Sequence, residues 1–225
     1  PYIMFCDQDD VWLPDKIEVS LKRIVELEKV FGQGKPLLLH TDLKVVNSKL
    51  EPIGDSFWKY QNLQPEHSKC WRNLLVQNTV TGCTTLFNRS LARLAHPIPP
   101  RAIMHDWWLA LVASLFGRVE YLNQQTVLYR QHSSNDTGAK AWGWPWIKSK
   151  LLSPDDVRSS LLRTQEQAAA LVERYGQHLD ATVSSTLATY GSLSELPPLA
   201  RRSFIVRNRL WMTGWVRNLG LLWAV

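Results

Sequence analysis

Residues 3–12, Ile-Met-Phe-Cys-Asp-Gln-Asp-Asp-Val-Trp, constrain the fold and the chemistry of this chain more than any other segment. The apolar start predicts a buried strand, which ends abruptly in three carboxylates within four residues. Carboxylates this close together repel one another unless a cation or hydrogen bonds compensate them. Oxygen ligands at the end of a strand suit Mg²⁺ or Mn²⁺, which bridge phosphate oxygens. The segment therefore predicts a metal and diphosphate site, and the alternative is a loop of solvated acids that cap turns.

The overall composition is that of a globular protein. The chain has 225 residues, of which 45% are hydrophobic and 20% charged, enough for one large domain or one domain with an appendage. Cys6, Cys70 and Cys83 have no CxxC spacing and cannot all pair, which argues against a zinc site or disulfide scaffold and fits a reducing cytoplasm. Eleven tryptophans suit a protein that binds sugar-like ligands or touches a membrane surface, although core packing uses tryptophan as well.

The net charge of +6 comes from the C-terminal segment. Residues 201–225 contain five arginines and no acid, whereas the remainder has 21 basic and 20 acidic residues. The pattern from Pro198 to Leu222 predicts a last helix that is basic, amphipathic and rich in tryptophan, which is typical of elements that lie in a membrane interface. The alternative is a terminal helix that docks on the body with its arginines in water. The longest apolar stretch, residues 107–117, is too short to span a bilayer.

Strands that alternate with helices predict an α/β fold, with the acidic segment at the carboxyl end of the first strand, where ligands bind in open α/β sheets. Asp15 and Glu18 match a capping box at the first helix, and residues 55–69 read as an irregular loop. The periodicity predicts helices over residues 15–32, 71–76, 105–117, 155–175 and 179–190. It predicts strands over residues 37–41, 77–87, 119–122 and 126–129, with an extended segment at 44–46.

Four residues outside the acidic segment are further candidates. Asp106 opens the helix at 105–117, where an N-cap is the commonest role of an aspartate and a catalytic base is the alternative; the two can coexist. Arg130 and His132 follow a strand and could reach a phosphate or metal from one face, although a lone histidine is more often structural. Gly82 interrupts the strand at 77–87, which indicates a bulge, a close ligand approach or a packing requirement.

Three segments resemble, in order, motifs of the family 2 glycosyltransferases, especially the bacterial rhamnosyltransferase-like branch. They are residues 5–17 (Phe-Cys-Asp-Gln-Asp-Asp-Val-Trp-Leu-Pro-Asp-Lys-Ile), 105–108 (His-Asp-Trp-Trp) and 128–132 (Leu-Tyr-Arg-Gln-His). The first looks like the metal-binding DxD segment of that family. The resemblance covers about residues 1–140, and leaves residues 141–225 as a helical C-terminal extension with the basic tail.

The resemblance implies a GT-A-like mixed sheet flanked by helices, a nucleotide-diphosphate sugar donor and an inverting displacement. The donor would be deoxythymidine diphosphate-rhamnose. The acceptor would be a hydroxyl of a growing glycan or lipid-linked molecule in bacterial surface polysaccharide synthesis. The enzyme would be cytoplasmic, at the inner face of the plasma membrane, with residues 201–225 on the anionic lipid surface. In that family the DxD segment follows a nucleotide-binding half of the fold, and here almost nothing precedes it. We therefore expect a fragment that binds the donor poorly by itself.

The resemblance also implies roles for the acids and their partners. Asp7 and Asp9 correspond to the DxD pair, with Asp9 as the direct Mg²⁺ or Mn²⁺ ligand and His132 as a further metal ligand. Asp10 and Arg130 would support the donor diphosphate and sugar. The metal ion and Arg130 would balance the negative charge that the departing diphosphate gains.

On the acceptor side, Asp106 falls where that family has its catalytic base. The base takes the proton from the acceptor hydroxyl as the oxygen attacks the anomeric carbon. Trp107 and Trp108, which follow Asp106 in the sequence, and Gly82 are candidates for contacts with the acceptor.

Two other functions fit parts of the sequence. Residues 7–11 also match DxDx[TV], the motif of haloacid-dehalogenase phosphatases, in which Asp7 would be the nucleophile. That mechanism needs a later acidic pair after a strand, and Asp155 with Asp156, at a helix start, match it poorly. A non-enzymatic module would use the basic tail to bind anionic lipid or nucleic acid. No nucleic-acid motif is present and the body is nearly neutral, so nucleic acid is not an expected partner.

Overall fold

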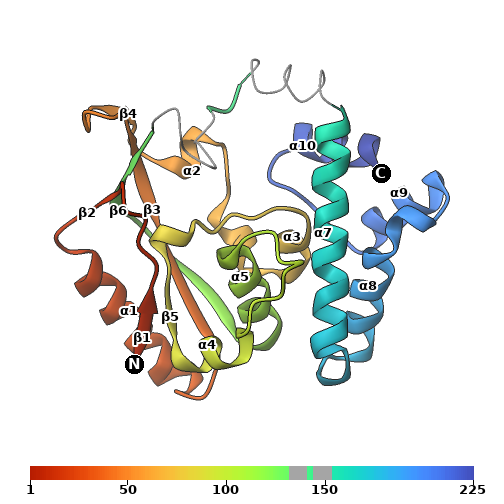
Figure 1. The fold of residues 1–225 in the computed structure, drawn as a ribbon, viewed down its shortest axis with the longest axis horizontal. Coiled ribbons are helices and arrows are strands. Elements are labelled where there is room, and N and C mark those ends of the chain that lie inside the picture. The colour runs from red at the N-terminus through yellow and green to blue at the C-terminus, as the bar shows by residue number, and fades with distance from the viewer. Residues whose placement is uncertain (132–140, 144–153) are drawn as a thin grey trace.

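The computed structural model describes residues 1–131, 141–143 and 154–225, and the predicted site residue His132 lies outside these ranges. The described part is a mixed α/β structure, as predicted (Figure 1). Its strands are β1 (Tyr2–Met4), β2 (Val11–Trp12), β3 (Leu37–Val46), β4 (Pro52–Gly54), β5 (Leu86–Asn88) and β6 (Arg118–Arg130). Its α-helices are α1 (Lys16–Phe31), α2 (Phe57–Tyr60), α3 (Trp71–Val76), α4 (Arg89–Ala95), α5 (His105–Phe116), α7 (Pro154–Tyr175), α8 (Ala181–Gly191), α9 (Pro198–Arg207) and α10 (Trp215–Ala224). The 3-10 turns are η1 (Pro65–Lys69), η2 (Gly82–Thr84), η3 (Gly176–His178) and η4 (Leu193–Glu195).

The sheet is mixed, with strand order β1-β5-β3-β6-β2 and with β4 paired to β3. Because β1 is antiparallel to β5, β5 antiparallel to β3, and β3 parallel to β6, the strands β1, β3 and β6 run in one direction and end at the same edge. Strands β1 and β2 stand at opposite ends of this order although only residues 5–10 join them. The acidic residues therefore cross the carboxyl edge of the sheet. The expectation that β1 is a buried strand is wrong, because Ile3 is 41% exposed on an end strand.

Alternate residues of β3 face opposite helix layers. Leu37 and Leu39 pack with Ile24 of α1, whereas Leu38 belongs to the cluster that contains α3 and α5. This period of two is what a strand covered on both faces requires. Helix α1 therefore lies on one face of the sheet, and α4 and α5 lie on the other (Figure 1).

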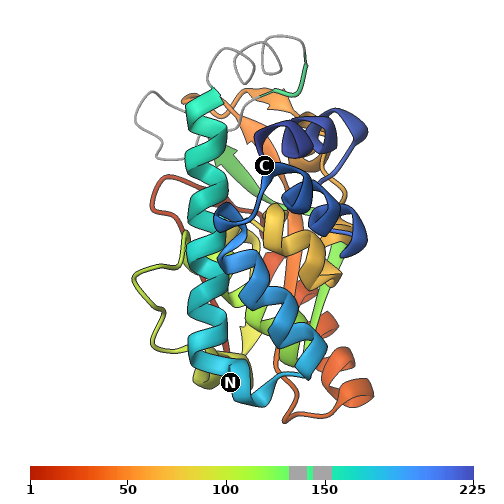
Figure 2. The same ribbon diagram turned by 90° about the vertical axis from the view of Figure 1, so that its right-hand side faces the viewer.

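The C-terminal helices share a core with the body of the molecule. Leu171 of α7, Leu187 of α8 and Ile205 of α9 are wholly buried in the cluster that also contains Leu74 of α3 and Leu111 of α5. Helices α7 and α8 form an outer layer beyond α3 and α5 (Figures 1 and 2). The predicted extension is thus helical, and its apolar face is buried against the sheet-containing part.

Three local predictions need correction. The side chain of Asp15 precedes α1 but makes no capping bond, because it accepts a hydrogen bond from Nε2 of Gln124 at 2.7 Å. The two strands predicted at 119–122 and 126–129 are one strand, β6, with a bulge opposite Asp42. The predicted loop at 55–69 contains α2, whose first amides, those of Phe57 and Trp58, donate to the buried carboxylate of Asp42 at 3.1 and 3.3 Å.

The predicted last helix is two helices, α9 and α10, separated by residues 208–214. Arg209 has a φ of 54° and Gly214 a φ of 80°, and neither angle continues a right-handed helix. Asn218 holds the connection through its side chain, which bonds both the amide and the carbonyl of Met212, at 2.8 and 2.9 Å. None of the helices in the described ranges is long and apolar enough to cross a membrane.

The shared core makes a stability prediction for α7. Replacing the wholly buried Leu171 with alanine should lower the free energy of unfolding by about 2–5 kcal/mol, because it removes apolar contacts and leaves a cavity. Leu162 on the same helix is 41% exposed, so Leu162→Ala should cost less than about 1 kcal/mol. Urea denaturation followed by circular dichroism measures both. Equal losses would contradict the burial of α7 against the body.

Candidate functional site

The acidic loop, residues 5–10, is fixed to the end of β6 by Arg130. The backbone amide of Arg130 donates to Oδ1 of Asp10 at 3.1 Å, and its Nε donates to the carbonyl of Asp9 at 2.8 Å. Its Nη1 also donates to the carbonyl of Ser48, at 2.9 Å. Arg130 therefore positions the loop across the sheet edge, in addition to placing a cation next to the acids.

A turn inside this loop decides which carboxylates meet. The amide of Asp10 points to the carbonyl of Asp7 at 3.4 Å, which closes a four-residue turn with residues 7 and 10 at its ends. One ligand atom each of Asp7, Asp10 and Cys83 lie within 4.8 Å of one another. The carboxylate of Asp9, predicted as the direct metal ligand, is not in this group. Asp9 still acts on Asp7 through its charge, and its role as a metal ligand stays a prediction.

The electrostatics of the cluster favour a bound cation. Burial raises the pKa of Asp10 to about 6, and the charges of Asp7 and Asp9 add to the increase. Burial, followed by the charge of Asp9, raises the pKa of Asp7 as well. Within the described part of the chain, Oδ2 of Asp10 is buried and has no hydrogen-bond partner. A divalent cation held by Asp7 and Asp10 would satisfy that oxygen and offset the repulsion.

Cys83 forms one wall of the cluster. Burial, with the charges of Asp10 and Asp7 and a hydrogen bond to the Asp10 carboxylate, raises the pKa of its thiol well above the usual value. A cation bound here would meet two carboxylates beside this thiol, and oxygen donors suit Mg²⁺ or Mn²⁺. Cys83 could not be assigned to the site from the sequence, because only the fold brings it beside the acidic loop.

Lys16 is also a site residue that the sequence did not predict. Its side chain is wholly buried, and its Nζ donates to the carbonyl of Cys83 at 2.8 Å and lies 4.8 Å from the centre of the Trp12 ring. Burial lowers the pKa of Lys16, whereas Cys83, Cys6 and Asp10 act in the opposite direction. Through this hydrogen bond Lys16 supports the turn that carries Cys83. The sequence feature that could have indicated Lys16 is its position within residues 5–17.

The strand predicted over residues 77–87 is shorter, with β5 beginning at Leu86 and the 3-10 turn η2 at Gly82–Thr84. The hydroxyl of Thr84 donates to the carbonyl of Thr81 at 2.7 Å, and that of Thr85 to the carbonyl of Gly82 at 2.8 Å. These side chains offer the backbone local partners that compete with a strand ladder. The turn places Cys83 and Gly82 between the acidic loop and α5.

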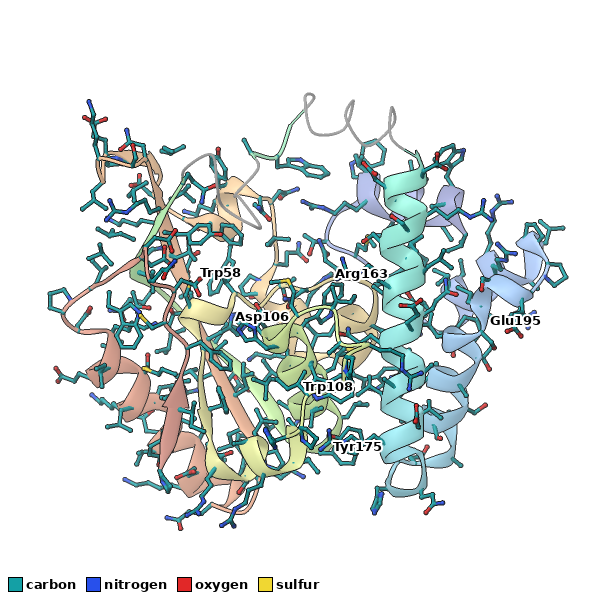
Figure 3. All side chains as sticks on the ribbon, in the orientation of Figure 1. Trp58, Asp106, Trp108, Arg163, Tyr175 and Glu195 are labelled. Carbon is teal, nitrogen blue, oxygen red and sulfur yellow. The ribbon has the colours of Figure 1, made fainter. Side chains whose placement is uncertain are left out.

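Asp106 lies in the first turn of α5, near the centre of the molecule (Figure 3), and is only 2% exposed. It is not the N-cap, since Met104 holds that position. Its Oδ1 accepts from the amide of Trp107 at 2.6 Å and from Nδ2 of Asn78 at 3.4 Å. Burial raises the pKa of Asp106, Asp7 adds to the increase, and His105 acts against it. Asp106 is therefore a buried carboxylate close enough to the acidic cluster to interact with it electrostatically.

Gly82 allows this approach. A β-carbon at position 82 would lie 3.0 Å from Nε2 of His105, which is tighter than most contacts, and 3.4 Å from Oδ2 of Asp106, which is in van der Waals contact. Of the alternatives that the sequence left open, the structure supports close packing of the turn against the start of α5. Gly82 thus permits the position of Asp106, and its own contact with an acceptor stays a prediction.

The two predicted acceptor tryptophans have different surroundings. Trp108 is wholly buried, and its indole N–H donates to the carbonyl of Ala95 at 3.2 Å (Figure 3). Trp108 therefore belongs to the hydrophobic core, and its contact with an acceptor stays a prediction. Trp107 is 9% exposed and lines a cavity of about 360 Å³.

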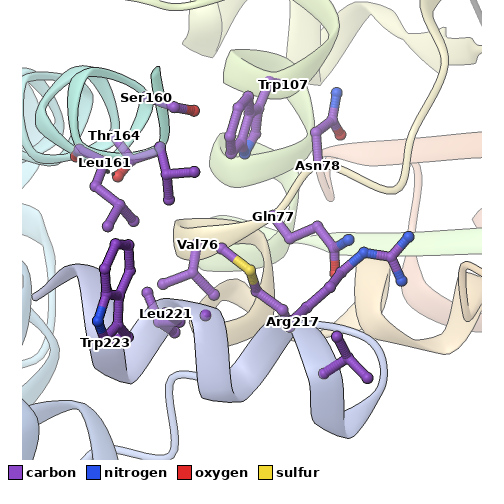
Figure 4. A pocket seen from close by; sticks show the side chains of 14 residues that line it. Val76, Gln77, Asn78, Trp107, Ser160, Leu161, Thr164, Arg217, Leu221 and Trp223 are labelled. Atoms are coloured by element: carbon purple, nitrogen blue, oxygen red, sulfur yellow. Dashed lines mark hydrogen bonds between the residues drawn. The ribbon is translucent and has the colours of Figure 1, made fainter. Parts of the chain in front are cut away.

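This cavity lies between α3, α5, α7 and α10 (Figure 4). It is mainly apolar, with Trp107 and Asn78 on one wall and Leu161 and Thr164 of α7 on another. Asn78 is shared between the cavity lining and the hydrogen bond to Asp106. No sequence signal marked this cavity, because its walls come from four separate segments.

Asp155 and Asp156, the acidic pair considered for a haloacid-dehalogenase mechanism, are not part of the group around Asp7. Both lie in the first turn of α7 and are exposed.

We compared the chain with known proteins. No protein-family model and no curated protein sequence matches it.

The raised pKa of Asp10 predicts a pH effect on stability in metal-free protein. Its pKa is about 6 when folded and 3.8 in the reference state, so between these values the folded protein binds more protons than the unfolded chain. Stability should therefore fall as the pH rises from about 4 to about 6. The variant Asp10→Asn should lack this component and gain stability relative to the parent as the pH rises. Thermal unfolding in a chelator at each pH tests this, and parallel curves for both proteins would contradict it.

Proposed function

We propose that this chain is the catalytic part of an inverting glycosyltransferase that uses a nucleotide-diphosphate sugar. The observation that carries the proposal is the position of Asp106, a buried carboxylate with a raised pKa, beside an acidic cluster at the carboxyl edge of a mixed sheet. Sugar transfer needs a base on one side of the reacting carbon and charge compensation for the leaving diphosphate on the other. The curled mixed sheet with helices on both faces is compatible with the GT-A fold that the sequence resemblance implies.

In this mechanism the cluster and the base have separate tasks. Asp7 and Asp10 would hold Mg²⁺ or Mn²⁺, which stabilises negative charge on a departing diphosphate. Asp106 would accept the proton of the acceptor hydroxyl, and a carboxylate with a raised pKa suits that task because it accepts a proton more readily near neutral pH. The hydrogen bond from Asn78 would orient Asp106 toward the acceptor.

The donor and acceptor are assigned by the resemblance alone. We propose deoxythymidine diphosphate-rhamnose as the donor and a hydroxyl of a glycan or lipid-linked molecule as the acceptor, in bacterial surface polysaccharide synthesis. Arg130 would add positive charge near the diphosphate while it holds the acidic loop. The phosphatase alternative is less favoured, because Asp155 and Asp156, its candidate second acidic pair, are exposed at the start of α7 and lie outside the group around Asp7.

Substituting the proposed base should abolish transfer and leave metal binding intact. Asp106→Asn keeps the shape of the side chain and removes the proton acceptor, so kcat should fall by about 10²–10⁴-fold. The assay follows release of nucleoside diphosphate from the donor by the product of the complete open reading frame. Asp155→Asn, an exposed acid outside the site, is the matched control. A variant Asp106→Asn with the parent rate would exclude Asp106 as the base.

The cluster makes a prediction about which acids bind the cation. Asp7→Asn and Asp10→Asn should each weaken Mn²⁺ binding on the order of tenfold or more, because each removes a converging carboxylate. Asp9→Asn should weaken it less, and Asp15→Asn, whose carboxylate bonds Gln124, should leave it unchanged. Electron paramagnetic resonance of free Mn²⁺ in titrations of residues 1–225 measures the affinities without donor or catalysis. The largest loss in Asp9→Asn would refute this geometry.

We also propose that α10 contacts an anionic membrane surface. Trp215, Leu219 and Trp223 are 74, 58 and 59% exposed and recur every fourth residue, so they form one apolar stripe along the helix. Residues 196–225 contain no acid. Exposed tryptophan and leucine are typical of helices that lie in a lipid interface. Arg217 of α10 donates to backbone carbonyls of the body, so the contact would be made by the apolar stripe.

Removing part of the stripe should weaken binding to vesicles. The double variant Trp215→Ser/Leu219→Ser should lower the partition coefficient onto phosphatidylglycerol vesicles on the order of tenfold, because less apolar surface leaves water. Val30→Ser on α1, where the side chain is 74% exposed, controls for the loss of any exposed apolar residue. Vesicle sedimentation measures both proteins. Equal partitioning of the double variant and the parent would exclude α10 as the contact.

A further inference from the structure

The apolar cavity between α3, α5, α7 and α10 is large enough to hold part of a substrate. Its volume of about 360 Å³ is within the range of ligand sites, roughly 300–1,000 Å³. Its walls include Asn78, Trp107, Leu161, Leu221 and Trp223, and it is open to solvent on the side of Gly220 and Trp223.

One wall of the cavity is connected to the proposed catalytic base. Asn78 lines the cavity and donates to Asp106, and Trp107, the next residue after the base, lines it as well. A molecule in the cavity would therefore have one end near Asp106. Gln77 and Asn78 place amide groups on this wall, whereas Leu161, Leu221 and Trp223 make the opposite region apolar (Figure 4).

The cavity also adjoins the apolar stripe of α10. Trp223 lines the cavity and is at the same time 59% exposed, in line with Trp215 and Leu219. Gly220, between these residues, is exposed and lines the cavity too. The outer stripe and the cavity therefore share Trp223.

We propose that this cavity binds the hydrocarbon chain of the acceptor, so that the acceptor is an amphiphile whose hydroxyl-bearing head reaches Asp106. The inference rests on the proposed function and specifies its acceptor class as lipid-linked. Polar acceptors without a chain would leave the apolar walls between Trp107 and Trp223 uncovered. A chain that fills them gains free energy from every methylene it buries, which holds the head group near the base.

Binding of alkyl glucosides to residues 1–225 tests the cavity without donor, metal or catalysis. Hexyl, heptyl and octyl β-glucoside are titrated below their critical micelle concentrations by calorimetry, with glucose as the probe that lacks a chain. Each added methylene should tighten binding about fourfold, and glucose should not bind measurably. Absence of saturable binding, or affinity independent of chain length, would overturn the proposal.

Cavity-filling variants locate the binding site. Ser160→Leu adds a side chain on the α7 wall, and Gly220→Leu adds one on the α10 wall, where a β-carbon meets no atom within 4 Å in the described structure. Both should weaken octyl glucoside binding at least about tenfold, because they occupy the space of two or more methylenes. Ser159→Leu, the adjacent exposed residue outside the cavity lining, should bind within twofold of the parent. Equal binding by the parent and both filling variants would place the chain elsewhere and refute the proposal.

Separate readouts distinguish this proposal from the proposed function. Asp106→Asn should retain octyl glucoside binding while transfer is lost, since the carboxylate is beside the cavity and does not line it. Chain binding without any sugar transfer by the complete open reading frame would refute the glycosyltransferase and retain a site for an apolar chain. Equal kcat/KM for acceptors with and without the chain would retain the glycosyltransferase and refute the inference.

Discussion

The candidate site depends on the compensation of carboxylates that the sheet topology brings together. Residues 5–10 must cross the carboxyl edge, because β1 and β2 lie at opposite ends of the strand order. The amide of Arg130 compensates one oxygen of Asp10, and Lys16 supports the turn of Cys83 below. The compensation is incomplete, since Oδ2 of Asp10 has no hydrogen-bond partner within the described residues. Incomplete compensation of neighbouring carboxylates is the physical basis on which a divalent cation would bind here.

Asp106 connects two parts of the molecule with different polarity. On one side, the turn at Gly82 brings it within electrostatic reach of Asp7 and the acidic loop. On the other side, Asn78 connects it to the apolar cavity. The same burial that forms this boundary raises the pKa of Asp106, and excludes water from the place where a proton would be transferred. A base at such a boundary suits a reaction between a charged donor and an amphiphilic acceptor.

Much of the fold could be predicted because its signals are local. The helices at 71–76, 105–117 and 155–175 follow from apolar periodicity, and the structure confirms them within one residue at each end. The prediction of a strand at 77–87 was wrong because the hydroxyls of Thr84 and Thr85 bond the local backbone. The prediction of a single last helix was wrong because Asn218, six residues away, holds the break at Met212. Cys83 and the cavity could not be predicted, since chain segments far apart in sequence form them.

The choice between Asp9 and Asp10 shows how backbone conformation determines which residues of a motif meet. In an extended segment, residues 7 and 9 would point to the same side, as the DxD spacing implies. Here the amide of Asp10 closes a turn on the carbonyl of Asp7, and a turn brings its first and fourth residues together. The carbonyl of Asp9, at the tip, accepts instead from Nε of Arg130. The sequence specifies three neighbouring carboxylates, and the turn brings those of Asp7 and Asp10 within 4.8 Å of each other.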